Sequence, residues 1–372
     1  MKTWHEEIPY RFDEPVTAEI FTEHTVFFDI ETTGFSPAHT SLYMIGCVSR
    51  RGDTLIVDQF FAEKTIEEKL LLLSFINQIE PCDTIISFNG SGFDIPYLKA
   101  KCGLLGVKER FLDYAHVDIY KVVSQLKFLL KTENCKQKSI EQFLGIRRDD
   151  TLSGGDLIDV YKNYLNQPND EALFLLRQHN YDDITGLPAL LPVLAYDKIL
   201  CGHYAVTSIE GSETMAQNGE PRKELLITLT NDYPAPKRVS CGNALFYLSV
   251  YKDKTQINVK LFDGELKFFF KDYKNYYYLP KEDAAVHKSL STYVDKEYRE
   301  PATAQNCYTK KRALFVPQYR EVMKPKFVEH YRDKLTYFEL TEDFTASDVM
   351  LRRYVKQVFD TLFDKNRHKK KA

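Results

Sequence analysis

Short apolar runs in the first ninety residues predict a β-sheet. Each run is rich in β-branched and aromatic residues and is followed by turn-forming residues. The four predicted strands are Thr25–Ile30, Leu42–Val48, Leu55–Phe61 and Thr84–Phe88. The first three follow one another without an intervening helical pattern, which indicates an antiparallel meander.

Apolar residues at helical spacing occupy the intervals between and after these runs. The expected helices are Thr65–Ile79, a helix through Ile95 and Leu104, the stretch Lys121–Leu144, and Glu171–Leu190. We expect Thr65 to be the N-cap of the first helix with Glu68 as its capping-box partner, and Gly145 to end a later one. Strands, a crossover helix, another strand and more helices predict an α/β fold with a sheet of about five strands flanked by helices.

The pattern changes near residue 200, which predicts two domains. Four β-type runs follow this point: Glu224–Thr230, Ala244–Val250, Gln256–Leu261 and Glu265–Phe270. Residues 281–372 are then expected to be mostly helical, ending in a helix over Ala346–Phe363 and a basic tail over Lys365–Lys371. We therefore expect an α/β domain over residues 1–200 and an α+β accessory domain over residues 201–372, β-rich first and then helical.

Composition and charge describe a globular protein with two dissimilar halves. Of 372 residues, 44% are hydrophobic and 28% are charged, which excludes disordered, collagen-like and disulfide-scaffold proteins. The formal net charge is −3, yet residues 1–200 carry 20 basic and 30 acidic side chains, and residues 201–372 carry 30 basic and 23 acidic ones. Such an asymmetry points to nucleic-acid or membrane contact, with solvated surface charge as the alternative.

The chain has no sequence feature of export. Its N-terminus, MKTWHEEIPYRFDEP, lacks the apolar core of a secretory signal, and no stretch approaches the roughly 18 apolar residues that span a bilayer. The seven cysteines form no C-x-x-C pair, which favours reduced thiols over zinc ligands or disulfides. We expect a cytoplasmic protein without a membrane partner.

Two carboxylates occupy alternate positions at the end of the first predicted strand, in the segment DIETTG. Asp29 and Glu31 lie at i and i+2 and therefore share one face of the strand. Like charges on a buried strand are unfavourable unless a cation neutralises them, and Mg2+ and Mn2+ prefer carboxylate oxygens. This spacing predicts a metal site, with a pair of surface acids on an edge strand as the alternative.

Two later segments carry further candidate groups. In SFNGSGFDIPYL, Asp94 begins a helix after a glycine turn that allows a ligand to approach the backbone closely. His179 and Asp183 lie at i and i+4, on one face of a helix, where an imidazole beside a carboxylate can orient or deprotonate water. Taken separately, Asp94 is an ordinary helix-start acid, and the other two are an ordinary surface pair.

Together, Asp-x-Glu, an Asp at a helix start and His-x3-Asp over about 155 residues resemble the DEDD superfamily of 3′–5′ exonucleases on the ribonuclease H-like fold. The segment Lys138–Tyr161 is especially similar to the YprB-type proteins. The resemblance covers about residues 22–195. It implies that Asp29, Glu31, Asp94 and Asp183 hold two divalent cations, Mg2+ or Mn2+, and that His179 takes or orients the proton of the attacking water.

The last motif departs from that superfamily. Its members carry Tyr four residues, or His five residues, before the final Asp, whereas His179 precedes Asp183 by four. Asp182 is therefore an alternative fourth ligand, although the i, i+4 pair reproduces the geometry of the tyrosine branch. His179 is either the general base or a water-orienting group.

The resemblance implies a substrate site around the first two motifs. The expected substrate-binding residues are Thr32, Thr33, Gly34, Phe35, Asn89, Phe93 and Tyr97, of which the three aromatic residues are candidates for stacking on a terminal base. The expected partner is single-stranded DNA or RNA, and the basic and aromatic segment Lys271–Tyr278 is a candidate platform for it. The expected function is a metal-dependent 3′–5′ exonuclease with a two-metal mechanism. The alternative is a noncatalytic nucleic-acid-binding protein that retains the fold.

Overall fold

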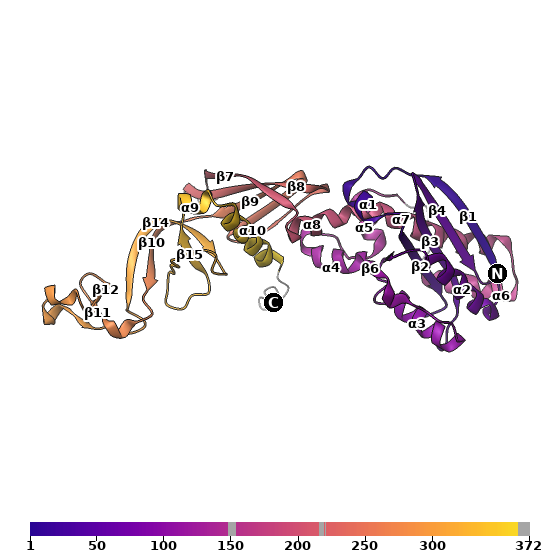
Figure 1. Ribbon diagram of the computed structural model, residues 1–372, viewed down its shortest axis with the longest axis horizontal. Coiled ribbons are helices and arrows are strands. Elements are labelled where there is room, and N and C mark those ends of the chain that lie inside the picture. Colours follow the sequence, from indigo (N-terminus) through magenta and orange to yellow (C-terminus); the bar gives the residue numbers. More distant parts are fainter. Residues whose placement is uncertain (148–153, 216–218, 220, 364–372) are drawn as a thin grey trace. The chain divides into compact units, whose positions relative to one another are not determined.

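The chain forms two compact units. The computed structural model describes residues 1–147, 154–215, 219 and 221–363. One unit comprises Met1–Lys198 together with Tyr233–Lys237, and the other comprises Ile199–Asp232 and the chain from Arg238 onward. Each unit contains its own sheets (Figure 1).

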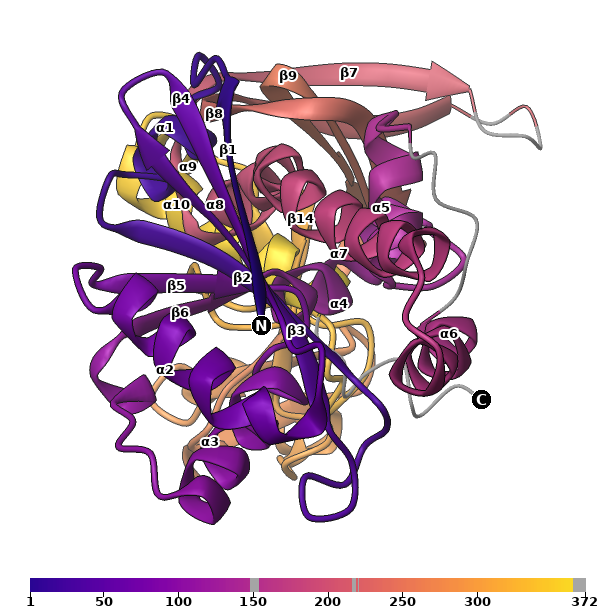
Figure 2. The same cartoon turned by 90° about the vertical axis from the view of Figure 1, so that its right-hand side faces the viewer.

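A six-stranded mixed sheet forms the centre of the first unit, in the order β1-β4-β3-β2-β5-β6 (Figure 2). The strands are β1 (Lys2–Pro9), β2 (Thr25–Thr32), β3 (Leu42–Arg51), β4 (Thr54–Phe61), β5 (Thr84–Ser87) and β6 (Ala115–Asp118). The first four pair in antiparallel fashion, and β2, β5 and β6 are parallel. The predicted α/β fold and its meander are confirmed. The prediction of about five strands missed β1, an edge strand with many polar residues, and β6, which has only four residues.

Helices cover both faces of this sheet. They are α1 (Pro15–Ile20), α2 (Glu68–Ile79), α3 (Asp94–Leu105), α4 (Ile119–Leu130), α5 (Gln137–Leu144), α6 (Gly154–Asn166), α7 (Asp170–Leu190) and α8 (Ala195–Cys201). Helices α2 and α3 lie on one side, and α6 and α7 lie on the other (Figure 2). Gly145 ends α5 with φ 85°, a left-handed conformation that suits glycine, as predicted.

The capping box predicted for the helix over Thr65–Ile79 is wrong. A 3-10 turn precedes α2, and the carboxylate of Glu67 accepts a hydrogen bond from the backbone N–H of Glu63 at 2.8 Å. Glu68, the expected partner of Thr65, is instead buried and pairs with the buried ammonium of Lys101 at 2.6 Å. A buried charge needs an opposite charge, so this long-range pair determines the orientation of Glu68.

The longest helical stretch is also strongly apolar. Asp170–Cys201 contains an 18-residue window with a mean hydropathy of 1.4, enough by length and composition to span a membrane. The sequence-based expectation overlooked it because polar residues interrupt the run. In the structure, 56% of that window is buried inside the protein, and α7 packs on β2 and β3. Packing in the domain core accounts for its apolar character.

The two faces of strand β2 carry different kinds of side chain. Val26, Phe28 and Ile30 face the hydrophobic core beneath α2 and α3. Because side chains alternate along a strand, Asp29 and Glu31 lie on the opposite face. This is the face on which α7 packs.

Gly46 in β3 allows α7 to approach the sheet closely. A Cβ atom at this position would lie 2.3 Å from Asn180 Oδ1 and 2.8 Å from two carbon atoms of Ile184. Asn180 is fully buried and accepts a hydrogen bond from Gln59 Nε2 of β4 at 3.0 Å. The same Nε2 donates to the carbonyl oxygen of Arg177 at 3.1 Å. These contacts determine which face of α7 meets β2.

The second unit contains three small sheets. Their strands are β7 (Tyr204–Met215), β8 (Pro221–Gly242) and β9 (Phe246–Lys260), then β10 (Phe262–Phe269), β14 (Tyr308–Gln318) and β15 (Thr336–Glu339), and finally β11 (Tyr276–Leu279), β12 (Ala284–His287) and β13 (Glu300–Pro301). Two helices follow, α9 (Glu342–Thr345) and α10 (Asp348–Phe363). The buried apolar residues of α10 confirm the helix predicted at this end of the chain.

The prediction that residues 281–372 are mostly helical is wrong. Residues 281–341 contain strands β12 to β15 and only short 3-10 turns as helical structure. Residues 308–315 of β14 pair with β10, so their partners lie 39 to 53 residues earlier in the chain. Local periodicity does not reveal such a partner. The basic tail, Lys365–Lys371, lies outside the described residues.

The substitution Gly46→Ala is expected to lower the free energy of unfolding by ~1–3 kcal/mol, because the new methyl group overlaps Asn180 and Ile184 and α7 must move. Gly103→Ala in α3 is the matched control. No atom lies within 4 Å of that added methyl group, so the better helix former should raise stability by ~0.5–1 kcal/mol. Urea unfolding measures both changes. Unaltered stability in Gly46→Ala would contradict the close approach.

Candidate functional site

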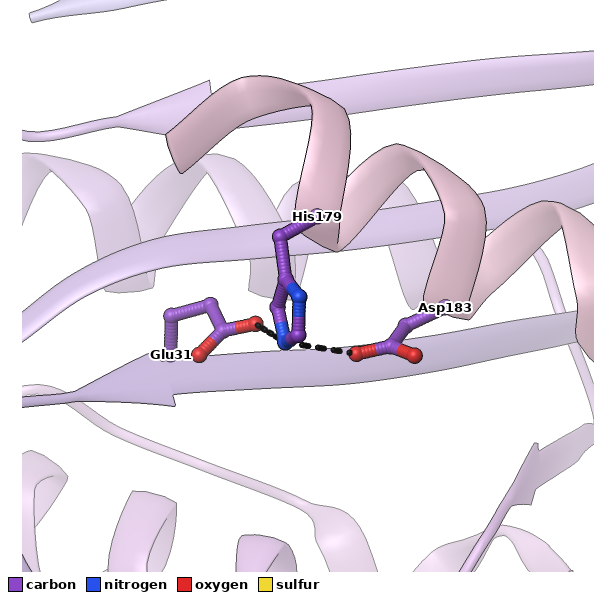
Figure 3. Close-up of side chains that lie close together, drawn as sticks. All are labelled: Glu31, His179 and Asp183. Atoms are coloured by element: carbon purple, nitrogen blue, oxygen red, sulfur yellow. Dashed lines mark ion pairs between the residues drawn. The ribbon is translucent and has the colours of Figure 1, made fainter. Parts of the chain in front are cut away.

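Three ionisable side chains converge where β2 passes beneath α7 (Figure 3). His179 Nε2 lies 3.7 Å from Glu31 Oε1 and 3.2 Å from Asp183 Oδ2. One ligand atom from each residue lies within 4.8 Å of the others. Glu31 and His179 are buried, and Asp183 is half-buried. The cluster therefore combines two carboxylates and an imidazole in a largely desolvated place.

Local geometry explains this convergence. Glu31 points toward α7 because of the alternation along β2, and the i, i+4 spacing places His179 and Asp183 on the helix face that meets it. Asp182, the alternative ligand, is not part of the cluster. Its carboxylate accepts a hydrogen bond from Gln178 Nε2 at 2.7 Å, one turn earlier on the helix.

Tyr43 contacts Glu31 directly, and Tyr161 packs against Tyr43. The Tyr43 hydroxyl donates to Glu31 Oε2 at 3.5 Å, and its ring stacks on Tyr161 of α6 with the centroids 4.2 Å apart. Tyr161 in turn donates to the carbonyl oxygen of Ala62 at 3.0 Å. Burial, with the negative charge of Glu31, raises the pKa of Tyr43 well above its usual value, so its hydroxyl keeps its proton. Sequence analysis missed both residues, because a tyrosine in a strand or helix has the pattern of an ordinary core residue.

Asp29 and Asp94 lie outside the three-residue cluster. Asp29 is half-buried on the same face of β2 as Glu31. Asp94 begins α3, as predicted, and is 5% exposed. Burial raises the pKa of Asp94 to about 7, a rise that the backbone N–H groups of Asp94 and Ile30 oppose and the nearby charge of Asp118 reinforces. The carboxyl group of Asp94 thus lies beside the backbone of β2 between Asp29 and Glu31.

The turn that leads into Asp94 is held by two residues that sequence analysis missed. Asp118, at the end of β6, accepts hydrogen bonds from the backbone N–H groups of Asn89 at 2.9 Å and Ser91 at 3.1 Å. His116 Nδ1 lies 3.3 Å from Ser91 Oγ. Asp118 is also the N-cap of α4, so its sequence position alone indicates only a helix start. In the structure it positions the turn as well.

The predicted aromatic substrate residues differ in accessibility. Phe35 is 89% exposed, and its ring contacts Phe93 edge-on at 5.8 Å between centroids. Phe93 is half-buried and contacts Tyr97 at 5.5 Å. Tyr97 is only 1% exposed, and its hydroxyl lies 2.9 Å from Thr40 Oγ1. The prediction that Tyr97 stacks on a base is therefore wrong, because this ring belongs to the core beneath Phe93.

The other predicted substrate residues form the two loops beside β2. The hydroxyl of Thr32 donates to the carbonyl oxygen of Gly34 at 2.9 Å, and the backbone N–H of Thr33 donates to Ser41 at 2.9 Å. Asn89 has a left-handed backbone with φ 69° and an exposed side chain. These residues shape the loops that flank the end of β2.

The donor set of the cluster suits a hard divalent cation. Glu31 and Asp183 provide carboxylate oxygens, the preferred ligands of Mg2+ and Mn2+, and His179 provides a nitrogen that Mn2+ also accepts. Burial strengthens the attraction between these carboxylates and a cation. The cluster is therefore a candidate acidic metal site.

Comparisons with known proteins agree with this fold. Residues 26–195 match the model of the RNase H superfamily. A DNA polymerase of Methanocaldococcus jannaschii is 27% identical over 32% of this chain and 9% of the polymerase. A DNA polymerase of a Thermococcus species is 29% identical over 27% of this chain and 13% of the polymerase. The matched part is thus a small fraction of both relatives.

Solved structures show weaker likenesses. A family B DNA polymerase from Pyrobaculum calidifontis has a TM-score of 0.37 and 19% identity, covering 46% of this chain and 25% of the other. Exonuclease I of E. coli in complex with a dT13 oligonucleotide has a TM-score of 0.32 and 11% identity, covering 56% and 55%. Residues 26–195, a little under half of the chain, thus match an RNase H-like superfamily domain, and the six-stranded mixed sheet is consistent with that fold.

Proposed function

We propose that this protein is a metal-dependent nuclease, most simply a 3′–5′ exonuclease that hydrolyses single-stranded DNA or RNA by a two-metal mechanism. The observation that carries the proposal is the convergence of Glu31, His179 and Asp183 within an RNase H-like domain. Two carboxylate oxygens and an imidazole nitrogen so close together are a donor set that Mn2+ accepts, and burial strengthens their attraction to a cation.

The carboxylates divide between two cation positions in this proposal. Glu31 and Asp183 would hold one cation, Asp94 would help to hold the second, and Asp29 would contribute to both. Bound divalent cations lower the pKa of a water molecule and neutralise negative charge on the phosphate and on the leaving 3′-oxygen. The pKa of Asp94, raised by burial, is a further reason to expect a cation beside it.

The chain's own residues supply proton transfer and orientation. His179 Nε2 accepts a proton or orients water, and Asp183 Oδ2 at 3.2 Å stabilises the protonated imidazole. Tyr43 keeps Glu31 in place through its hydrogen bond. Phe35 is the exposed ring for stacking on a terminal base, with Phe93 packed against it. Thr32, Thr33, Gly34 and Asn89 line the path along which the nucleic-acid strand reaches these groups.

Asp183→Asn is expected to lower the rate of nucleotide release from a single-stranded oligonucleotide by about 100-fold or more, because a metal ligand loses its charge. Asp182→Asn is the matched control and should keep the rate within a few-fold. A 5′-labelled substrate separated on a gel should show a ladder that shortens from the 3′ end. Cleavage of a circular single strand would contradict exonuclease action. Binding without cleavage of either DNA or RNA would favour the noncatalytic alternative.

Mn2+ is expected to raise the melting temperature of the wild-type protein, because binding to the folded state alone stabilises it by ~2.7 kcal/mol at a hundredfold excess over Kd. Asp29→Asn should reduce or abolish the rise, since it removes the proposed bridging charge. Calorimetry with and without Mn2+ measures the effect, and Asp182→Asn again serves as the control. An equal rise in Asp29→Asn would remove Asp29 from the metal site.

The pKa of Asp94, raised to about 7, predicts a pH-dependent effect of Asp94→Asn in metal-free protein. A raised pKa favours the neutral carboxyl group, so stability from this residue is fully present below its ordinary pKa of 3.8 and is lost progressively as pH rises to about 7. Asparagine mimics the neutral acid. In EDTA, Asp94→Asn should therefore melt above wild type at pH 8, by a smaller margin at pH 5, and close to it at pH 4. A difference that does not change with pH would contradict the burial of an ionisable group here.

A further inference from the structure

The second unit contains a hollow that the proposed catalytic site does not use. Its volume is about 820 Å3, within the size range of small-ligand pockets. It lies between the end of β10 and the segment 321–336 that leads into β15. The family model ends at residue 195, so this hollow belongs to the part of the chain that it leaves unmatched.

Aromatic rings form the walls of this hollow. Phe269 of β10 and Tyr331 contact each other at a tilt of 52° with their centroids 5.1 Å apart, and Phe268 meets Phe270 edge-on at 5.3 Å. Tyr273 extends the same wall along the chain. All five rings are half-buried, so each packs on the protein with one part and leaves another accessible. Flat apolar ligands fit such walls, because aromatic rings stack on them.

Cationic side chains surround the hollow. Lys271, Lys324, Lys326 and Arg332 line it and are exposed. Two carboxylates also line it. Glu321 lies 3.2 Å from Lys324 and 3.9 Å from Lys326, and Asp333 accepts a hydrogen bond from the backbone N–H of His330 at 2.7 Å. Within the described ranges, no carboxylate lies at ion-pair distance from Lys271 or Arg332. Arg332 lies over the Tyr331 ring, with its guanidinium carbon 5.1 Å from the ring centroid. Because this contact does not neutralise its charge, Arg332 and Lys271 can both attract an anionic ligand.

We propose that this hollow is a second binding site for single-stranded nucleic acid, in which a base stacks among the rings while Lys271 and Arg332 contact the flanking phosphates. Aromatic faces beside cations whose charge no carboxylate neutralises are the combination that single-strand binding uses. The inference rests on the proposed function, because it assigns the same substrate strand a second point of attachment on the chain. An acidic peptide with aromatic side chains has the same negative charge as a nucleic acid. Binding such a peptide does not require several aromatic side chains on which flat bases stack.

The ring contribution is tested by Tyr331→Leu and Tyr331→Phe. Binding of a fluorescein-labelled oligothymidylate is measured by anisotropy in EDTA, where the proposed nuclease cannot cleave it. Tyr331→Leu should weaken binding about tenfold or more, because it removes a stacking face, and Tyr331→Phe should bind as wild type does. A melting temperature within the wild-type range for Tyr331→Leu confirms that the fold survives. Equal binding by Tyr331→Leu and wild type would overturn the proposal.

The cationic contribution is tested by the double variant Lys271→Ala and Arg332→Ala. A plot of the logarithm of the association constant against the logarithm of salt concentration has a negative slope. Its magnitude should decrease by about 0.7 for each phosphate that the variant no longer neutralises. Lys334→Ala, an exposed cation that does not line the hollow, should leave the slope unchanged. An unchanged slope in the double variant would overturn the proposal. Displacement by a peptide of Glu and Phe, with no displacement by unlabelled oligothymidylate, would also overturn it.

These outcomes separate this inference from the proposed function. Metal-dependent cleavage by wild type, together with normal oligonucleotide binding by Tyr331→Leu and by the Lys271/Arg332 double variant, would reject the second site alone. Ring- and cation-dependent binding without any cleavage would support the second site and reject the nuclease.

Discussion

The close approach of α7 to the central sheet is the constraint on which the candidate site depends. His179 and Asp183 meet Glu31 only because Gly46 has no side chain and Asn180 fills that space, held by Gln59. A larger residue in β3 would displace the helix and with it two of the three converging groups. Helix rotation is determined by the same contact, so the i, i+4 pair faces β2 and Asp182 does not. The same contacts therefore determine both the packing of the core and the geometry of the site.

Electrostatics is the reason for proposing a cation at this site. Burial raises the pKa of Asp94, and the neighbouring Asp118 raises it further. Tyr43 donates a hydrogen bond to Glu31 but carries no charge to neutralise it. The buried ion pair between Glu68 and Lys101 shows the contrasting solution, in which a protein cation compensates the acid and also anchors the loop through the Thr40 carbonyl oxygen. At the candidate site, a divalent cation is the counterpart that the proposed function assigns to the carboxylates.

The uneven charge of the two halves has a structural counterpart in the second unit. Several of its basic residues are already paired, as Lys310 is with Asp283 and Lys311 with Glu339. Lys271 and Arg332 lie instead beside a hollow lined by aromatic rings. A count of basic residues does not separate these two groups. Of the segment Lys271–Tyr278 that sequence analysis singled out, Lys271 and Tyr273 line this hollow, whereas Tyr278 donates a hydrogen bond to Asp283.

The sequence by itself determined the α/β order of the first unit and the faces on which its chemistry lies. Alternation along β2 and the helical spacing of His179 and Asp183 are local rules, so Glu31 and this pair were predictable before any fold was known. Only the tertiary structure decided that Tyr97 is core, that Glu68 pairs with Lys101, and that Tyr43, His116 and Asp118 support the site. It also replaced the helices expected over residues 281–341 with strands. These outcomes depend on partners far away in the chain, and no local pattern of residues records which partner the folded protein brings near.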